Sequence, residues 1–210
     1  GGFFHHCAST HCDQLMLRRW VQFGVFNPIF RFHSAPGGGS RMPWDYHQAT
    51  CEHLLSLLRL RNSLIPYVYT AARRHHDCGR PLVRGMFFDR PGDAEAYRFD
   101  QFWFGEHLVV APILSAENHR AVWLPPGRWW RFESGDAVEA GLHPCFQAGA
   151  GSIPVFVPAG SILVRQDPAK DPSSPHVGHL WLDCYAGADG GTELYEDDGR
   201  SNRYRDEAGC

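Results

Sequence analysis

Arg31 and His33 are the two residues of this 210-residue chain whose types and spacing best fit a chemical role. They alternate with Phe30 and Phe32 in a short apolar stretch, which predicts a strand from Ile29 to His33. Successive side chains of a strand point to opposite faces, so Arg31 and His33 share one face and the two phenyl rings share the other. The rings can anchor the strand while the polar pair faces solvent. A hydrogen-bonded structural histidine remains the alternative interpretation.

Residues 5–12 hold the most metal-like cluster in the sequence. Imidazole and thiolate groups are the usual ligands of zinc, and five of them crowd into this short segment: His5, His6, Cys7, His11 and Cys12. Structural zinc sites draw on two ligand pairs separated by a spacer, and no second pair follows here. The pattern therefore favours a histidine-rich surface loop, and we expect no metal and no cofactor.

The acidic residues do not form an obvious catalytic pair. Aspartates that could act together occur at turns or helix starts, where Asp is common because its side chain bonds to the backbone: Asp45, Asp89, Asp100, Asp197 and Asp198. The segment Glu193–Ser201 lacks the alternating oxygen ligands of a calcium loop, which favours a solvated hairpin turn. Phosphate-binding glycine loops and the Gly-x-Ser-x-Gly elbow are absent from the sequence.

The elements that must position Arg31 and His33 are helical. Helical spacing of apolar residues predicts a helix from Asp13 to Phe26 and a second from Cys51 to Arg74, which Pro66 interrupts and Cys78-Gly79 ends. A loop rich in Gly and Pro, Ser34 to Pro43, follows the predicted strand. This order of helix, strand and helix is typical of a parallel α/β unit.

Short runs rich in Val, Phe, Trp and Tyr, separated by turn signals, follow Pro81 and predict an all-β sandwich. The predicted strands are Leu82–Phe88, Gln101–Phe104, Leu108–Pro112, Ala121–Leu124, Trp129–Phe132, Ile153–Val157 and Ser161–Val164. From Gln166 to His176 the composition is that of a linker. His179–Tyr185 and Thr192–Tyr195 then predict the start of another β unit.

Composition excludes several classes of partner. The chain is 43% hydrophobic, as expected of a folded globular protein, and its net charge of −3 with no basic run argues against nucleic acid. No apolar stretch is long enough for a membrane helix, so we expect no membrane partner. Seven scattered cysteines favour a reducing compartment such as the cytoplasm. The residues Gly1-Gly2-Phe3-Phe4 are typical of the interior of a domain, so we expect this chain to be a fragment. The sequence therefore does not decide the cellular compartment.

The ordered motifs together resemble the C-terminal part of family-31 glycoside hydrolases, the α-glucosidase and α-xylosidase family. The matching stretches cover nearly the whole chain: 1–3 (GGF), 19–34 (RWVQFGVFNPIFRFHS), 43–44 (PW), 58–70 (LRLRNSLIPYVYT), 79–84 (GRPLVR), 100–112 (DQFWFGEHLVVAP), 123–129 (WLPPGRW), 153–162 (IPVFVPAGSI) and 193–201 (ELYEDDGRS).

The resemblance implies a fold of α/β plus all-β class. Residues 1–77 would form the C-terminal portion of a (β/α)8 TIM barrel, residues 78–165 a proximal β-sandwich, and residues 166–210 a linker and the start of a distal β domain. Barrel enzymes carry their sites at the C-terminal ends of strands, where His33 is expected to fall.

The resemblance also implies a retaining α-glycosidase, specifically an α-glucosidase, acting on a carbohydrate with terminal α-linked glucose or xylose. His33 would hydrogen-bond the sugar in the cleaved subsite, Phe3 would help to wall that subsite, and Arg31 would support it by pairing with a carboxylate. The nucleophile and the acid/base aspartate of the family belong to earlier strands, so we expect no catalytic residue in this chain and no activity from it alone. A non-catalytic carbohydrate-binding or structural β-sandwich module is the alternative.

Overall fold

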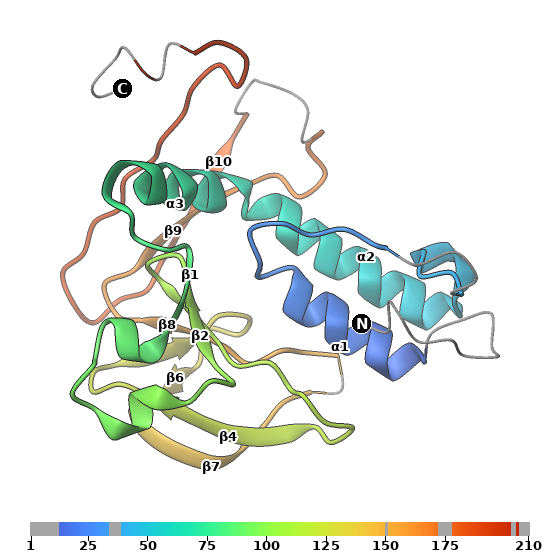
Figure 1. Ribbon diagram of the computed structural model, residues 1–210, viewed down its shortest axis with the longest axis horizontal. Helices are drawn as coiled ribbons and strands as arrows, with labels where there is room; N and C mark the ends of the chain where they lie inside the picture. The colour runs from blue at the N-terminus through green and yellow to red at the C-terminus, as the bar shows by residue number, and fades with distance from the viewer. Residues whose placement is uncertain (1–12, 34–38, 150, 172–177, 203–204, 206–210) are drawn as a thin grey trace.

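The computed structural model describes residues 13–33, 39–149, 151–171, 178–202 and 205. Helices occupy the first part of the chain and short strands the second, as Figure 1 shows. Phe3 and the histidine and cysteine cluster of residues 5–12 lie outside the described residues, so their predicted roles stay predictions. None of the described helices is both long enough and apolar enough to cross a membrane.

The helices begin and end where local chemistry predicts. Helix α1 (Gln14–Gly24) begins at Asp13, whose carboxylate accepts a hydrogen bond from the Met16 N–H. The predicted second helix is broken into α2 (Gln48–Ser63) and α3 (Ile65–Cys78). Pro66 lies in the first turn of α3, where its missing N–H costs nothing. Gly79 ends α3 with a left-handed φ of 71°.

The prediction of a strand from Ile29 to His33 is wrong. These residues follow α1 without forming a strand, and a single 3₁₀ turn, η1 (Pro43–Asp45), precedes α2. A strand needs a hydrogen-bonded neighbour, and none of the strands in the described part of the chain pairs with this segment. The described residues therefore do not form the predicted parallel α/β unit. Its helices are present, but the strand between them is not.

Among the described residues, the second part of the chain forms ten strands and two 3₁₀ turns. Their bounds are β1 (Val83–Gly85), η2 (Met86–Phe88), η3 (Ala94–Tyr97), β2 (Phe102–Phe104), β3 (Leu108–Val110), β4 (His119–Leu124), β5 (Trp129–Arg131), β6 (Ala137–Val138), β7 (Gly141–Gln147), β8 (Val155–Pro158), β9 (Ile162–Gln166) and β10 (Leu180–Cys184). Six strands form a sheet in the order β1-β2-β3-β8-β5-β6, and β4 with β7 and β9 with β10 form two further pairs. All seven pairings among these strands are antiparallel.

The six-stranded sheet separates two hydrophobic cores. Leu108 and Val110 of β3 pack in the core that contains the helices, whereas Val109 between them packs in the core that contains β4. On β8, Phe156 likewise faces β4 while its neighbours face the helices. This alternation is the period of two expected of a strand buried on both faces. The helices are thereby fixed against one face of the sheet.

The predicted and observed strands differ at several places; for example, residues 86–88 of the predicted strand Leu82–Phe88 form η2 instead. Strand β7 was not predicted, because its side chains are mostly exposed and Pro144 interrupts its apolar pattern. Residues 192–195 form no strand; the Tyr195 N–H instead donates to the Thr70 hydroxyl on α3. The predicted strand at 179–185 is confirmed as β10, which pairs with β9 across the predicted linker. The boundary between the two β domains stays a prediction.

Candidate functional site

The turn that follows α1 is held by Arg61 from α2. The Arg61 guanidinium donates to the carbonyls of Val25, Asn27 and Pro28 at 3.0, 2.5 and 2.7 Å. The Asn27 amide in turn donates to the Phe23 carbonyl at 2.8 Å and completes the C-terminal end of α1. Burial lowers the pKa of Arg61, yet a guanidinium remains protonated in proteins, so the turn is fixed by charge-assisted bonds.

Gly24 lets the chain fold back closely on α1 after this turn. The Phe30 ring occupies the space where a side chain at position 24 would stand. Phe30 also contacts Phe32 edge to face, with ring centroids 5.4 Å apart, and both rings pack against the core beneath the helices. The two phenyl rings therefore anchor residues 30–33 without the hydrogen bonds of a sheet.

Arg31 and His33 are exposed, whereas the neighbouring Phe30 and Phe32 are half-buried. The alternation predicted from the sequence is thus present in the side chains although the strand is not. Both residues line a hollow of about 590 Å³ between α1 and the returning chain. The side chain of Arg41, held by the Gly39 carbonyl at 2.6 Å, lines the same hollow.

The hollow has a mainly apolar wall, and its charged side chains are basic. None of the described residues that line it is acidic, and its walls are mainly aromatic and aliphatic side chains of α1 and of the turn: Leu17, Trp20, Val21, Phe23, Ile29, Phe30 and Phe32. An apolar wall with a few polar groups is typical of small-molecule sites. The carboxylate partner predicted for Arg31 and the sugar contacts predicted for His33 and Phe3 stay predictions.

The aspartates weighed in the sequence make structural contacts. Asp89 pairs with Arg80 and Arg84, and Asp100 pairs with Arg120 at 2.7 Å. Asp45 accepts a hydrogen bond from Ser40. Asp197 accepts hydrogen bonds from tyrosine hydroxyls, and Asp198 accepts two from backbone N–H groups of its own turn. Within the described residues, no three His, Cys, Asp or Glu side chains are placed to share a metal ion.

Sequence reasoning missed Arg61, because an arginine among the leucines of an amphipathic helix looks like a solvated charge. The available signal was a turn with several unpaired carbonyls after α1, which needs a donor from elsewhere. It also missed Gly24 as a point of close approach, since a glycine at a helix end is normally explained by the turn alone.

Comparison with known families decides the identity of this architecture. Residues 1–71 match the description "Glycosyl hydrolases family 31 TIM-barrel domain", and residues 79–163 match "Glycosyl hydrolase family 31 C-terminal domain". The chain belongs to glycosyl hydrolase family 31. The family resemblance inferred from the sequence is confirmed. The predicted order, a TIM-barrel domain followed by a C-terminal domain rich in strands, is also confirmed.

Family-31 relatives align along nearly the whole chain. Alpha-glucosidase 2 of Bacillus thermoamyloliquefaciens is 31% identical over 97% of this chain and 26% of its own length. An alpha-xylosidase of Saccharolobus solfataricus is 30% identical over 97% of this chain and 28% of its own length. The structure of a family-31 dextranase from Flavobacterium johnsoniae complexed with glucose superposes with a TM-score of 0.84 at 29% identity, covering 95% of this chain and 25% of that one. The chain spans about a quarter of the length of these relatives.

Proposed function

We propose that this chain is part of a retaining α-glycosidase, specifically an α-glucosidase, that hydrolyses O-glycosyl bonds at terminal α-linked sugars. The observation that carries the proposal is the exposed pair Arg31 and His33 in the hollow beside α1, in a family whose relatives include an alpha-glucosidase and an alpha-xylosidase. His33 would hydrogen-bond the sugar at the cleaved position, and Phe3 would form part of the wall.

The architecture proposed for these residues follows the family. Residues 1–77 would complete the C-terminal part of a (β/α)8 barrel, residues 78–165 would form the proximal β-sandwich, and residues 166–210 would lead into a distal β domain. In such a barrel the segment 29–33 would gain the neighbouring strand that it lacks among the described residues, because each barrel strand is paired on both sides.

Hydrolysis with retention needs two carboxyl groups about 5–5.5 Å apart, one as nucleophile and one as acid and base. Asp89 and Asp100 are already paired with arginines, and no acidic residue among those described lines the hollow. We therefore propose that both catalytic aspartates come from outside these 210 residues and that this chain alone is inactive. Arg31 would pair with a carboxylate of that missing part.

The test is a rate measurement on nitrophenyl α-glucoside and nitrophenyl α-xyloside. The 210-residue chain should be inactive, whereas a protein extended by the upstream coding sequence should prefer the glucoside. In the extended protein His33→Ala should lower kcat/KM about tenfold or more. His75→Ala, at an exposed position of α3, is the matched control and should leave the rate unchanged.

Two results would contradict the proposal. Hydrolysis by the 210-residue chain itself would place the catalytic carboxylates within it. An inactive extended protein that still binds saccharide would instead identify a non-catalytic carbohydrate-binding module.

A further inference from the structure

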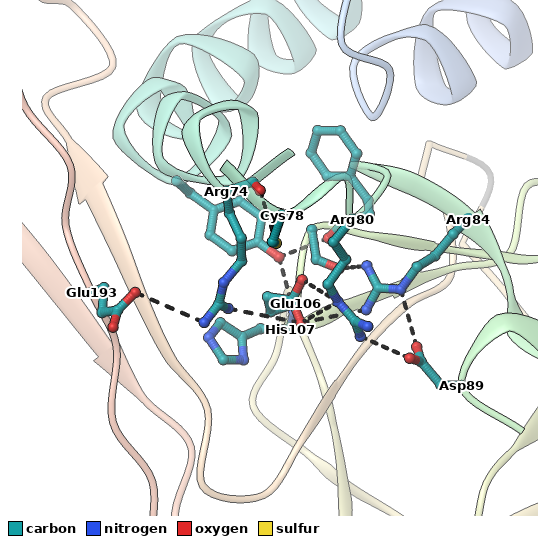
Figure 2. Close-up of polar contacts among 11 residues, drawn as sticks. Arg74, Cys78, Arg80, Arg84, Asp89, Glu106, His107 and Glu193 are labelled. Atoms are coloured by element: carbon teal, nitrogen blue, oxygen red, sulfur yellow. Dashed lines mark hydrogen bonds and ion pairs between the residues drawn. The ribbon is translucent and has the colours of Figure 1, made fainter. Parts of the chain in front are cut away.

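A second cavity, of about 1000 Å³, lies between α3 and the C-terminal segment 191–195. It shares no lining residue with the hollow at His33. Its polar side chains come from three places: Arg73, Arg74 and Asp77 from α3, Glu106 and His107 from the turn between β2 and β3, and Thr192, Glu193 and Tyr195 from the C-terminal segment. Figure 2 shows Arg74, Glu106, His107 and Glu193 converging from these elements.

Charges of both signs surround the cavity. Two guanidinium groups, those of Arg73 and Arg74, and three carboxylates, those of Asp77, Glu106 and Glu193, line it. Arg80, Arg84 and Asp89 do not line it, but they extend the network of ion pairs to four arginines and four carboxylates. Glu106 alone faces three of these arginines. A charged ligand would meet a group of its own sign here, so this mixture of charges favours an uncharged one.

Arg74 is the arginine of this cluster whose side-chain N–H groups make no hydrogen bond to the described residues. Its guanidinium is 3.9 Å from the Glu106 carboxylate and 3.8 Å from that of Glu193, too far for hydrogen bonds. By comparison, Arg80 Nε lies 2.8 Å from Glu106 and Arg84 Nε lies 3.0 Å from Asp89. Among the described residues no acceptor makes a hydrogen bond to the Arg74 side chain, which is nearly half exposed at 46%.

His107 presents a neutral imidazole to the same cavity. Burial lowers its pKa, so at neutral pH one ring nitrogen donates and the other accepts. Only its backbone N–H is engaged in the described structure, as donor to the Tyr67 hydroxyl at 2.9 Å. The Tyr67 ring is an aromatic neighbour of the imidazole, with ring centroids 6.2 Å apart and an interplanar angle of 35°.

We propose that this cavity binds an uncharged, polyhydroxylated ligand, the hexose unit of a saccharide. Sugar hydroxyls donate and accept at once, and they would bridge the donors of Arg74 to the carboxylate oxygens of Glu106 and Glu193 without adding a charge to the network. The His107 ring offers a further donor and acceptor. The cavity is also at the upper end of the range of ligand sites, about 300–1,000 Å³.

Hydrogen–deuterium exchange of the 210-residue chain, with maltose as the probe, tests the site. Maltose at about 10–100 mM should protect peptides that cover residues 104–110 and 191–195, since millimolar affinity is usual for a site with few contacts. Arg74→Gln should raise the maltose concentration that gives half-maximal protection about tenfold, as expected when a charged donor is lost. Arg59→Gln, the same change at an exposed position of α2, is the matched control.

A second variant and a second probe make the outcome decisive. His107→Phe keeps a ring in place and removes both nitrogens, and it should also weaken protection; the exposed Arg74 variant decides the matter if His107→Phe unfolds. The proposal is overturned if maltose gives no saturable protection, if Arg74→Gln and Arg59→Gln behave alike, or if inorganic phosphate protects these peptides and maltose does not. Peptides covering residues 29–33 report separately on the hollow at His33, so failure of either site is distinguishable.

Discussion

The edge of the Phe30 ring lies against the backbone of Gly24, so closely that a Cβ at position 24 would stand 2.6 Å from both Cδ2 and Cε2 of the ring. Real Cβ atoms do not approach other atoms so closely. The contact fixes the path by which the chain leaves α1 and reaches Arg31 and His33.

Gly24→Ala should therefore destabilise the chain. Displacing a half-buried ring costs about 1–3 kcal/mol, more than the gain in helix propensity of at most about 1 kcal/mol. Urea unfolding measures the difference. Gly92→Ala is the control, because nothing lies within 4 Å of its added Cβ, and it should change the unfolding free energy by less than about 0.5 kcal/mol. Equal effects of the two substitutions would contradict the packing argument.

Arg61→Met should lower the free energy of unfolding by about 2–3 kcal/mol, because three carbonyls of the turn after α1 lose a charged donor. Arg59→Met removes the same charge from an exposed position on the same helix and should be close to neutral. Chemical denaturation followed by tryptophan fluorescence compares the two. If Arg61→Met were as stable as Arg59→Met, the turn would have to be held by its own packing.

Tyr67→Phe should cost about 1–3 kcal/mol, since its buried hydroxyl has two backbone partners that would lose their bonds. It donates to the Phe104 carbonyl at 2.7 Å and accepts from the His107 N–H at 2.9 Å. Tyr97→Phe loses one bond, to the Pro91 carbonyl, at an exposed position and is the matched control. If both variants unfolded at the same temperature as the native protein in a thermal melt, the Tyr67 hydroxyl would contribute no stability.

The contact of the C-terminal segment with α3 should weaken in acid. The Tyr195 hydroxyl, followed by that of Tyr69 and the Gly199 N–H, holds the pKa of Asp197 below its usual 3.8. A carboxyl group with a lowered pKa in the folded state stabilises above its unfolded pKa, and this contribution is lost as the pH falls through the folded value. On the alkaline side, burial and the bond to Asp197 raise the pKa of Tyr69 to about 12, so this hydroxyl keeps its proton.

Protease cleavage within residues 191–199 measures this effect between neutral pH and about pH 3. An acid-stable protease should cut the native chain faster at the acid end. Asp197→Asn should be cut at a rate that depends less on pH, because no proton is taken up at that position. An identical pH profile for both proteins would assign the acid sensitivity to other groups.

The sequence predicted local structure well where neighbouring residues determine it. Pro66 restarts a helix and Gly79 ends it because each acts through its own backbone. The alternation of Phe30, Arg31, Phe32 and His33 was also predicted correctly, since it depends only on which side chains are apolar.

Features that depend on distant partners were not predictable in this way. A strand at 29–33 requires a neighbouring strand, and β7 is recognisable only through its pairing with β4. The role of Arg61 depends on carbonyls more than thirty residues earlier in the chain. The cavity beside α3 likewise combines residues from three remote segments, none of which carries a motif of its own.

The position of β8 has a consequence for synthesis. It lies between β3 and β5 in the sheet, yet it follows both in the chain. As the polypeptide leaves the ribosome, β3 and β5 emerge first, each with an open row of backbone donors and acceptors. A nascent chain that stops before Val155 would expose both edges to other chains, which is the usual start of aggregation. One late strand closes both edges, so both stay open until residues 155–158 have been made.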